Sequence, residues 1–187
     1  LRRLRLASPF VLRTVEPQPD DLRDRTVTGI RRIGKRIVIE LENATFIVIH
    51  LMIAGRFRWL DPGAKIPGKL GLAAFDLDHG TLVLTEAGSK RRASIHIVRG
   101  EDALREFDPG GIEVLESSLD DFRDAIRRER HTLKRTLTDP HLFSGIGNAY
   151  SDEILHRARL SPFQRPAQLD DEAWARLHDA CQEVLRE

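Results

Sequence analysis

A pair of glycines stands immediately ahead of a helical pattern in the second half of the chain. Gly145-Ile146-Gly147 is followed by Asn148 and then by the run Ala149–Ala158. Glycines in this place let backbone N–H groups approach an anion closely, and the helix dipole favours negative charge at the helix N-terminus. Lys134 lies one short helix upstream and could meet the same anion. The pattern indicates a phosphate site; a plain helix cap without a ligand is the alternative that it leaves open.

Basic residues are concentrated in the first third of the chain. The 187 residues carry a formal net charge of +1, but residues 1–60 hold 12 Lys/Arg against 6 Asp/Glu. Residues 61–130 hold 11 against 14, and residues 131–187 hold 7 against 9. Clustered Arg and Lys are the electrostatic footprint of phosphate binding. The first third is therefore the expected place for a polyanion, and a solvated charged face is the alternative.

Composition and cysteine content exclude several classes of protein. Apolar residues make up 41% of the chain and charged residues 32%, which is typical of a globular protein. No apolar run reaches the roughly 18 residues of a membrane span, and no signal-peptide pattern opens the chain. The single cysteine, Cys181, can form no internal disulfide and cannot make a cysteine-rich zinc site. We therefore expect no membrane contact and no metal or other cofactor bound by these residues.

The first part of the chain has the pattern of β-strands. Seven short runs, rich in β-branched or apolar residues, are separated by turn-prone Gly, Asn and Asp and have no helix between them. They are Thr26–Ile33, Arg36–Leu41, Thr45–Leu51, Arg56–Leu60, Leu70–Leu77, Thr81–Thr85 and Ser94–Val98. Such a series predicts an antiparallel sandwich or barrel.

From residue 118 onward the hydrophobic period is helical, with capping or stopping residues at the segment ends. Four helices are predicted: one from Ser118 through Leu119, Phe122, Ile126 and Arg130, one over Thr132–Thr138 stopped by Asp139-Pro140, one over Ala149–Ala158 capped by Asn148, and one from Asp170 carrying Trp174, Leu177, Cys181 and Leu185. Asp108-Pro109-Gly110-Gly111 is typical of a linker. The expected organisation is α+β, with a β-rich domain at 1–107, a linker at 108–117 and an all-α domain at 118–187.

Two stretches in these halves resemble one known family. The first, residues 133–162, reads LKRTLTDPHLFSGIGNAYSDEILHRARLSP. It resembles the helix–two-turn–helix motif of the formamidopyrimidine-DNA glycosylase and endonuclease VIII family of base-excision repair enzymes. The second, residues 31–60, reads RRIGKRIVIELENATFIVIHLMIAGRFRWL and resembles the strands of that family's N-terminal β-sandwich. The resemblance implies an antiparallel β-sandwich followed by an all-α helix–two-turn–helix domain.

The resemblance implies contacts with DNA for particular residues. Lys134 and Asn148, with Gly147 beside them, match the family residues that hold the phosphate of the damaged nucleotide. Lys35, in Gly34-Lys35-Arg36, matches the sandwich lysine that approaches the DNA backbone at the active site. Such contacts suit an enzyme that extrudes a base, because the strand must be held while the base leaves the stack.

Two further segments match the family with departures. His50–Gly55 reads HLMIAG where the family usually has HLGMSG, so Ile53 takes the place of the methionine that fills the space left by the flipped base. Lys90–Ala93 reads KRRA where the family has PRRF. Arg91 would then probe the base opposite the lesion, and Ala93 replaces the phenylalanine wedge.

The residues themselves leave other interpretations open at these positions. Ile53 alternates with buried neighbours, which favours a core position, and His50 would equally suit a core histidine. Arg91 and Arg92 would suit a solvated turn. The aromatic residues Trp59, Tyr150 and Trp174 are interpreted as packing residues.

The implied activity is that of a DNA glycosylase and AP lyase. An N-terminal proline amine attacks C1′, expels the oxidised base and leaves a Schiff base, from which the strand is cut. The 187 residues contain no Pro-Glu start and no four-cysteine zinc finger. We therefore assign no catalytic residue in this chain, apart from Lys35 as an active-site backbone contact, and expect the chain alone to be inactive.

We expect the start and the zinc finger to belong to a longer, bacterial, full-length protein. It would act as a cytoplasmic, nucleoid-associated monomer on duplex DNA with a damaged base or an abasic site. The alternative is a non-catalytic relative that binds abasic or distorted duplex. A ribosome-associated or topoisomerase-like helical module is a third interpretation, which the β half argues against.

Overall fold

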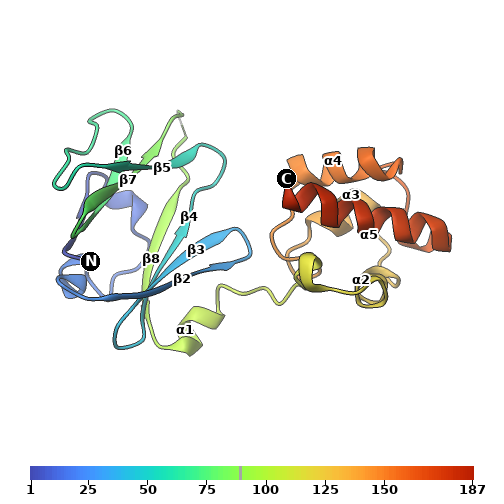
Figure 1. Ribbon diagram of the computed structural model, residues 1–187, viewed down its shortest axis with the longest axis horizontal. Coiled ribbons are helices and arrows are strands. Elements are labelled where there is room, and N and C mark those ends of the chain that lie inside the picture. The colour runs from blue at the N-terminus through green and yellow to red at the C-terminus, as the bar shows by residue number, and fades with distance from the viewer. Residues whose placement is uncertain (89) are drawn as a thin grey trace. The chain divides into compact units, whose positions relative to one another are not determined.

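The computed structural model describes every residue of the chain except position 89. The described residues form two compact units, residues 1–107 and residues 108–187 (Figure 1). Each unit has its own hydrophobic core. The first is built of strands and the second of helices, so the α+β fold class is confirmed.

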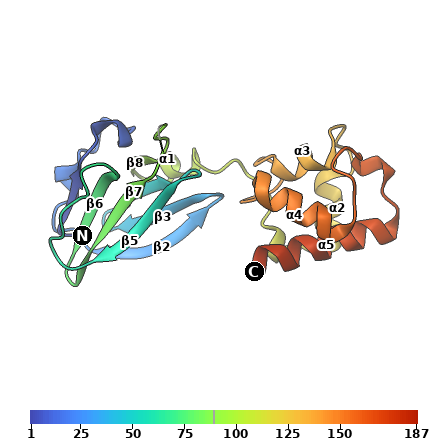
Figure 2. The same cartoon turned by 90° about the horizontal axis from the view of Figure 1, so that it is seen from above.

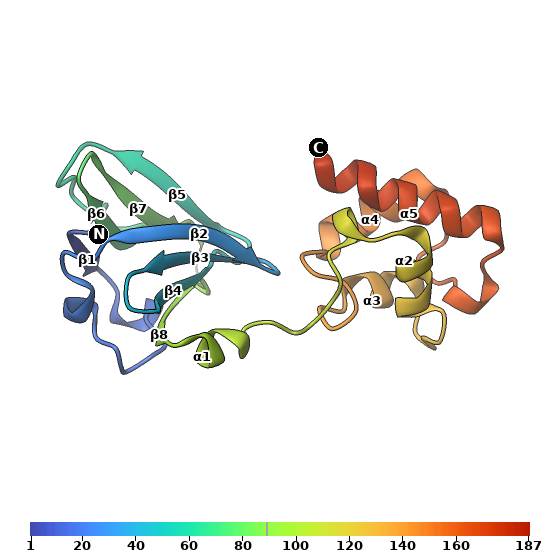
Figure 3. The ribbon, with the colours of Figure 1, turned by 60° about the horizontal axis from the view of Figure 1, so that its bottom comes forward.

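The first unit is a sandwich of two four-stranded antiparallel sheets, which lie as two layers (Figure 3). One sheet has the order β1 (Arg3–Leu6), β6 (Gly71–Leu77), β7 (Gly80–Glu86) and β5 (Gly55–Leu60). The other has the order β2 (Val27–Ile33), β3 (Arg36–Leu41), β4 (Thr45–His50) and β8 (Ser94–Arg99). The seven predicted strands are all present. Strand β1 was missed because four residues, two of them arginines, give too short an alternation to be recognised.

The apolar residues of both sheets meet in one core, which includes Ile47, Phe75, Leu84 and Ile95. Strand β4 is buried along Thr45–Ile49 because its outer face is covered too. There Phe46 and Val48 pack with Leu104 of the short helix α1 (Glu101–Arg105). This double burial explains why the strand has a continuous apolar run instead of an alternating one.

The second unit contains four helices: α2 (Leu119–Ile126), α3 (Leu133–Thr138), α4 (Asn148–Ala158) and α5 (Asp171–Arg186). Helices α4 and α5 lie side by side (Figure 2), and their buried residues share a core with Phe122 and Phe143. Two of the predicted caps are present: the Ser118 hydroxyl and the Asp170 carboxylate accept hydrogen bonds from the N–H groups of Asp121 (3.1 Å) and Ala173 (2.8 Å).

Two boundaries in this unit differ from the sequence pattern. Helix α2 stops at Ile126, short of the predicted Arg130, because Arg127, Arg128 and Arg130 are exposed and give the last turn nothing to bury. Residues 112–117, which were expected in a linker, pack on the helices. The Ile112 N–H donates to the Leu142 carbonyl (3.0 Å), and Val114 is buried.

No helix among the described residues has the length and apolar character needed to cross a membrane. The same residues contain no group of three or more His, Cys, Asp or Glu side chains that could hold a metal ion.

Candidate nucleic-acid interface

Three loops emerge at one end of the sandwich because of the strand register. Ile33 pairs with Arg36, Arg36 with His50, and His50 with Ser94, so these residues form one row across the sheet. The β2–β3 turn, the loop between β4 and β5, and the loop between β7 and β8 therefore start or end at this row. We call this region the loop end (residues 34–35, 51–54, 87–88 and 90–93). It carries Lys35, Ile53 and Arg91, which are far apart in the sequence.

The loop between β4 and β5 is a tight turn that exposes an apolar side chain. Met52 has φ +55°, a left-handed conformation, and its N–H donates to His50 Nδ1 (3.1 Å). The Gly55 N–H donates to the Leu51 carbonyl (3.0 Å), and Arg56 Nη1 donates to the carbonyls of Ile53 (3.0 Å) and Gly55 (2.7 Å). The Ile53 side chain is 83% exposed. The interpretation of Ile53 as a core residue is therefore wrong.

The electrostatics of the loop end favour a neutral histidine beside cations. Partial desolvation lowers the pKa of Lys35 at the tip of the β2–β3 turn. Burial lowers the pKa of half-buried His50, and the positive charges of Arg36 and Lys35 lower it further. An uncharged His50 also fits the hydrogen bond that its Nδ1 accepts from Met52. Because its pKa is lowered, His50 adds little at neutral pH to the positive charge of Lys35 and Arg36 beside it.

The loop between β7 and β8 presents arginine but no apolar wedge. Arg91 and Arg92 are exposed, as expected for either a DNA contact or a solvated turn. The Arg91 guanidinium donates to the Lys69 carbonyl oxygen. Ala93 is buried, so it has no side chain to insert into a duplex.

In the second unit the glycine pair shapes the start of α4. Gly145 has φ +84°, which favours glycine. Gly147, with extended backbone, is the N-cap, and Asn148 is the first helical residue. The prediction that Asn148 caps the helix is therefore wrong. Its side chain is exposed, and the N–H groups of this first turn are open to an anion.

Lys134 lies beside the first turns of α4. Its Nζ is 2.7 Å and 2.8 Å from the two carboxylate oxygens of Asp152. Asp152 follows Asn148 by four residues and so shares its face of the helix. We call residues 145–148 together with Lys134 the helix cradle. Sequence reasoning missed Asp152; its i, i+4 relation to Asn148 was the signal that could have found it.

The aromatic residues predicted to pack differ in burial. Trp174 is buried in the helical core, whereas Trp59 and Tyr150 are 58% and 47% exposed. Tyr150 belongs to the first turn of α4, next to the helix cradle.

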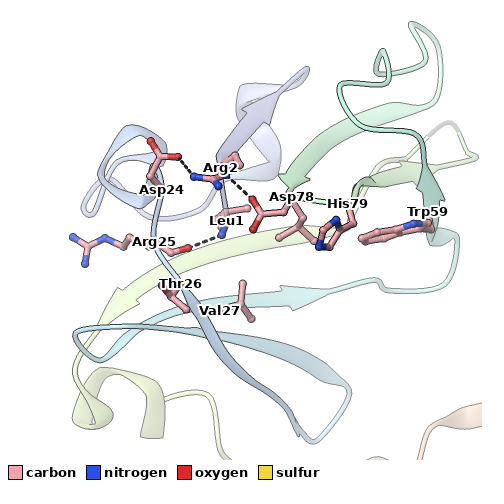
Figure 4. A pocket seen from close by; sticks show the side chains of 10 residues that line it. Leu1, Arg2, Asp24, Arg25, Thr26, Val27, Trp59, Asp78 and His79 are labelled. Atoms are coloured by element: carbon pink, nitrogen blue, oxygen red, sulfur yellow. Dashed lines mark hydrogen bonds and ion pairs between the residues drawn. The ribbon is translucent and has the colours of Figure 1, made fainter.

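A pocket of about 440 Å³ lies at the other end of the sandwich (Figure 4). Several of its polar groups pair with one another. Arg2 Nη1 is 3.1 Å from Asp24 Oδ1, Arg2 Nε is 2.5 Å from Asp78 Oδ1, and the Leu1 amine donates to the Arg25 carbonyl. None of the predicted site residues lines it.

The fold is a β-sandwich followed by a helical unit in which a glycine pair leads into α4, and the comparisons name the family. The family model of the formamidopyrimidine-DNA glycosylase N-terminal domain matches residues 1–95. That of the formamidopyrimidine-DNA glycosylase H2TH domain matches residues 111–187. The chain belongs to the formamidopyrimidine-DNA glycosylase family.

Individual relatives agree with this assignment. The formamidopyrimidine-DNA glycosylase of Heliobacterium modesticaldum is 36% identical over 174 residues, which cover 90% of this chain and 62% of the relative. That of Listeria monocytogenes is 27% identical over 179 residues, 92% of this chain and 65% of the relative. The chain thus spans less than two thirds of the length of these two relatives.

Solved structures share the fold. The Lactococcus lactis Fpg in complex with DNA containing an abasic site superposes with a TM-score of 0.87 at 23% identity, over 100% of this chain and 69% of that one. Its complex with DNA containing FAPY-dG also superposes with a TM-score of 0.87, over 100% of this chain and 71% of that one.

Proposed function

We propose that this chain forms the DNA-binding part of a glycosylase that excises an oxidised base and cleaves at the resulting abasic site. The observation that carries the proposal is the loop end, where strand register gathers Lys35, Ile53 and Arg91 from three separate loops. The names of the relatives and the DNA in the related complexes support the same activity and partner. The partner would be bacterial chromosomal DNA, and the protein would bind it as a monomer.

The residues of the loop end suit base extrusion. Unstacking a base costs about a few kcal/mol, and an apolar side chain that fills the void repays part of that cost. Exposed Ile53 would fill it. Lys35 would hold the backbone of the extruded nucleotide, and Arg91 would contact the opposite base, since a guanidinium can form paired hydrogen bonds with a base edge.

The helix cradle suits a phosphate of the damaged strand. The open N–H groups at the start of α4 and the helix dipole attract an anion, and the Asn148 amide can donate to it. Lys134 would add a charge-assisted hydrogen bond after exchanging Asp152 for the phosphate.

The proposed chemistry needs a neutral amine. In the proposed reaction an N-terminal secondary amine forms a bond to C1′ as the bond from C1′ to the base breaks, and the departing base takes up a proton. The C1′–O4′ bond then opens to give the Schiff base, which permits elimination of the strand. The 187 residues contain no N-terminal Pro-Glu. We therefore propose that the 187-residue polypeptide by itself binds but does not cleave.

Borohydride trapping on a duplex with one abasic site tests this function. The 187-residue chain and the full product of its gene are compared on the abasic duplex and on an intact duplex of the same sequence. We expect both proteins to prefer the abasic duplex, with affinity falling steeply with salt, and only the full product to be trapped. Binding without trapping by both would indicate a non-catalytic DNA binder. Trapping by the 187-residue chain would assign the nucleophile to Leu1, Lys35 or Lys134, and equal affinity for both duplexes would contradict damage recognition.

A further inference from the structure

A buried carboxylate lies beneath the arginine loop of the loop end. Glu86 is the last residue of β7 and is 2% exposed. Its carboxylate accepts hydrogen bonds from the main chain: the Arg92 N–H lies 2.9 Å from each oxygen, and the Ala93 N–H lies 3.1 Å from Oε2. Burying a carboxylate is costly unless hydrogen bonds replace its water. These N–H groups provide that replacement.

We propose that Glu86 is a positioning residue that fixes the arginine loop and thereby aims Arg91 at the base opposite the lesion. The inference rests on the role proposed above for Arg91. The loop leaves the sheet directly after Glu86 and returns to the Glu86 side chain at Arg92. Arg91 is the residue immediately before the two clamped amides, so the carboxylate sets the place of its main chain.

Glu86 itself is held on rigid structure. It pairs with Gly55 across β5 and β7, and its N–H donates to the Leu70 carbonyl (2.9 Å). The preceding carbonyl, that of Lys69, accepts from the Arg91 guanidinium. The side chain of Arg91 and the main chain that follows it are thus both held by hydrogen bonds to the same corner of the sandwich. The pairing with Gly55 also places the start of the Ile53 loop next to this corner.

A carboxylate suits this position because it only accepts hydrogen bonds. The two main-chain donors converge on its two oxygens. Glu86→Gln keeps the size of the side chain but replaces one oxygen by an NH₂ group. That NH₂ group would face a main-chain N–H, and two donors cannot form a hydrogen bond with each other. Because Ala93 is buried and offers no wedge, recognition in this loop depends on its arginines and on how well they are aligned.

The test compares Glu86→Gln with a matched control on the same strand. Thr81, at the other end of β7, is also fully buried, and its hydroxyl accepts from the Gly63 N–H (2.9 Å) and donates to Asp76 Oδ1 (2.9 Å). Thr81→Val removes these hydrogen bonds while leaving the arginine loop untouched. Arg91→Ala provides the reference for lost recognition of the opposite base.

Two readouts are measured on the 187-residue chain: amide exchange at Arg92 and Ala93, and affinity for abasic duplexes carrying each of the four opposite bases. We expect Glu86→Gln to expose both amides to exchange and to bring the affinity ratio between the best and worst opposite base to within about threefold, as Arg91→Ala does. Glu86→Gln should change this ratio no further in the Arg91→Ala background. Thr81→Val should keep the wild-type ratio.

Three results would overturn the inference. Glu86→Gln could speed amide exchange at Arg92 and Ala93 while keeping the wild-type affinity ratio between opposite bases, or it could leave the exchange unchanged. The third is a wild-type chain that binds abasic duplex with no opposite-base preference. Failure of the proposed function is a different result, namely a wild-type chain that does not prefer abasic over intact duplex. In that case the exchange data still show whether Glu86 holds the loop, but the role in base recognition is lost.

Discussion

The loop end and the helix cradle both present cationic side chains but are built in different ways. At the loop end, the apolar Ile53 is displayed on a turn with a left-handed Met52, and hydrogen bonds between side chains and the main chain hold the shape. In the helix cradle, Lys134 is paired with Asp152 on a regular helix. The loop end depends on the shape of its backbone. The helix cradle depends on the charge of Lys134, which can exchange Asp152 for a phosphate as its partner. Substitutions should therefore act on stability and selectivity at the loop end, and on general affinity and salt dependence in the cradle.

The largest effect is expected from Gly55→Ala. An added Cβ would lie 2.3 Å from the Leu51 carbonyl oxygen, which is main chain and cannot move aside without opening the turn. We expect a loss of about 3 kcal/mol in the free energy of unfolding of the first unit, the upper part of the usual cost of overpacking. Gly34→Ala has open space around the new Cβ and only the strain of φ +56°, so about 1 kcal/mol is expected there. Urea unfolding measures both, and equal losses would show that the close approach at Gly55 is relieved.

Cys181 provides a control on where Gly55→Ala acts. Burial in the helical core raises the pKa of its thiol to about 12, so the thiol should react with alkylating reagents only when the second unit opens. The labelling rate of Cys181 should be the same in wild type and Gly55→Ala. Faster labelling in the variant would mean that the damage is not confined to the loop end.

In the helix cradle, Lys134→Met should weaken binding to every duplex by a similar factor. Loss of one charge-assisted hydrogen bond to phosphate corresponds to roughly 10- to 100-fold in affinity. The slope of log K against log salt should become shallower by about 0.9, because one fewer phosphate is neutralised. Arg135→Met, at the exposed next position, is the control for loss of charge alone. Equal effects of the two substitutions would contradict the assignment of Lys134.

A smaller effect of opposite sign is expected from Asp152→Asn. The Lys134 and Asp152 side chains are 38% and 56% exposed, so their ion pair is screened and contributes at most about 1 kcal/mol. Freeing Lys134 should therefore strengthen binding by up to about fivefold. Glu153→Gln removes the same charge one residue further on and should have less effect. If Asp152→Asn weakens binding, the carboxylate orients Lys134 and does not compete with phosphate.

Sequence reasoning found most of the framework because its signals are local. β-Branched runs and capping residues such as Ser118 and Asp170 indicate strands and helix starts whatever their tertiary contacts are. Ile53 shows where this fails: alternation places it in the core only if the strand continues, but β4 ends at His50 and the left-handed Met52 breaks the alternation. The burial of Glu86 and the pairing of Lys134 with Asp152 depend on tertiary contacts. The i, i+4 relation to Asn148 places Asp152 on the right face of α4 but does not show that Lys134 meets it.

The smallest effect expected is on the pH dependence of the loop end. His50 has a lowered pKa in the folded chain, chiefly because burial disfavours its charged form and also because Arg36 and Lys35 are near. The unfolded chain then binds more protons once the pH falls below the usual histidine value near 6.5, so stability is present above that value and is lost on acidification.

In His50→Asn a side-chain oxygen can still accept the Met52 N–H but no longer titrates. Urea unfolding at about pH 7.5 and 5.5, on either side of the usual histidine value, should show a smaller loss for His50→Asn than for wild type. Some loss should persist in the variant, because burial also lowers the pKa of His96. Equal losses in the two proteins would mean that His50 becomes protonated in the folded state as readily as in the unfolded one, and that the cations beside it do not constrain its charge.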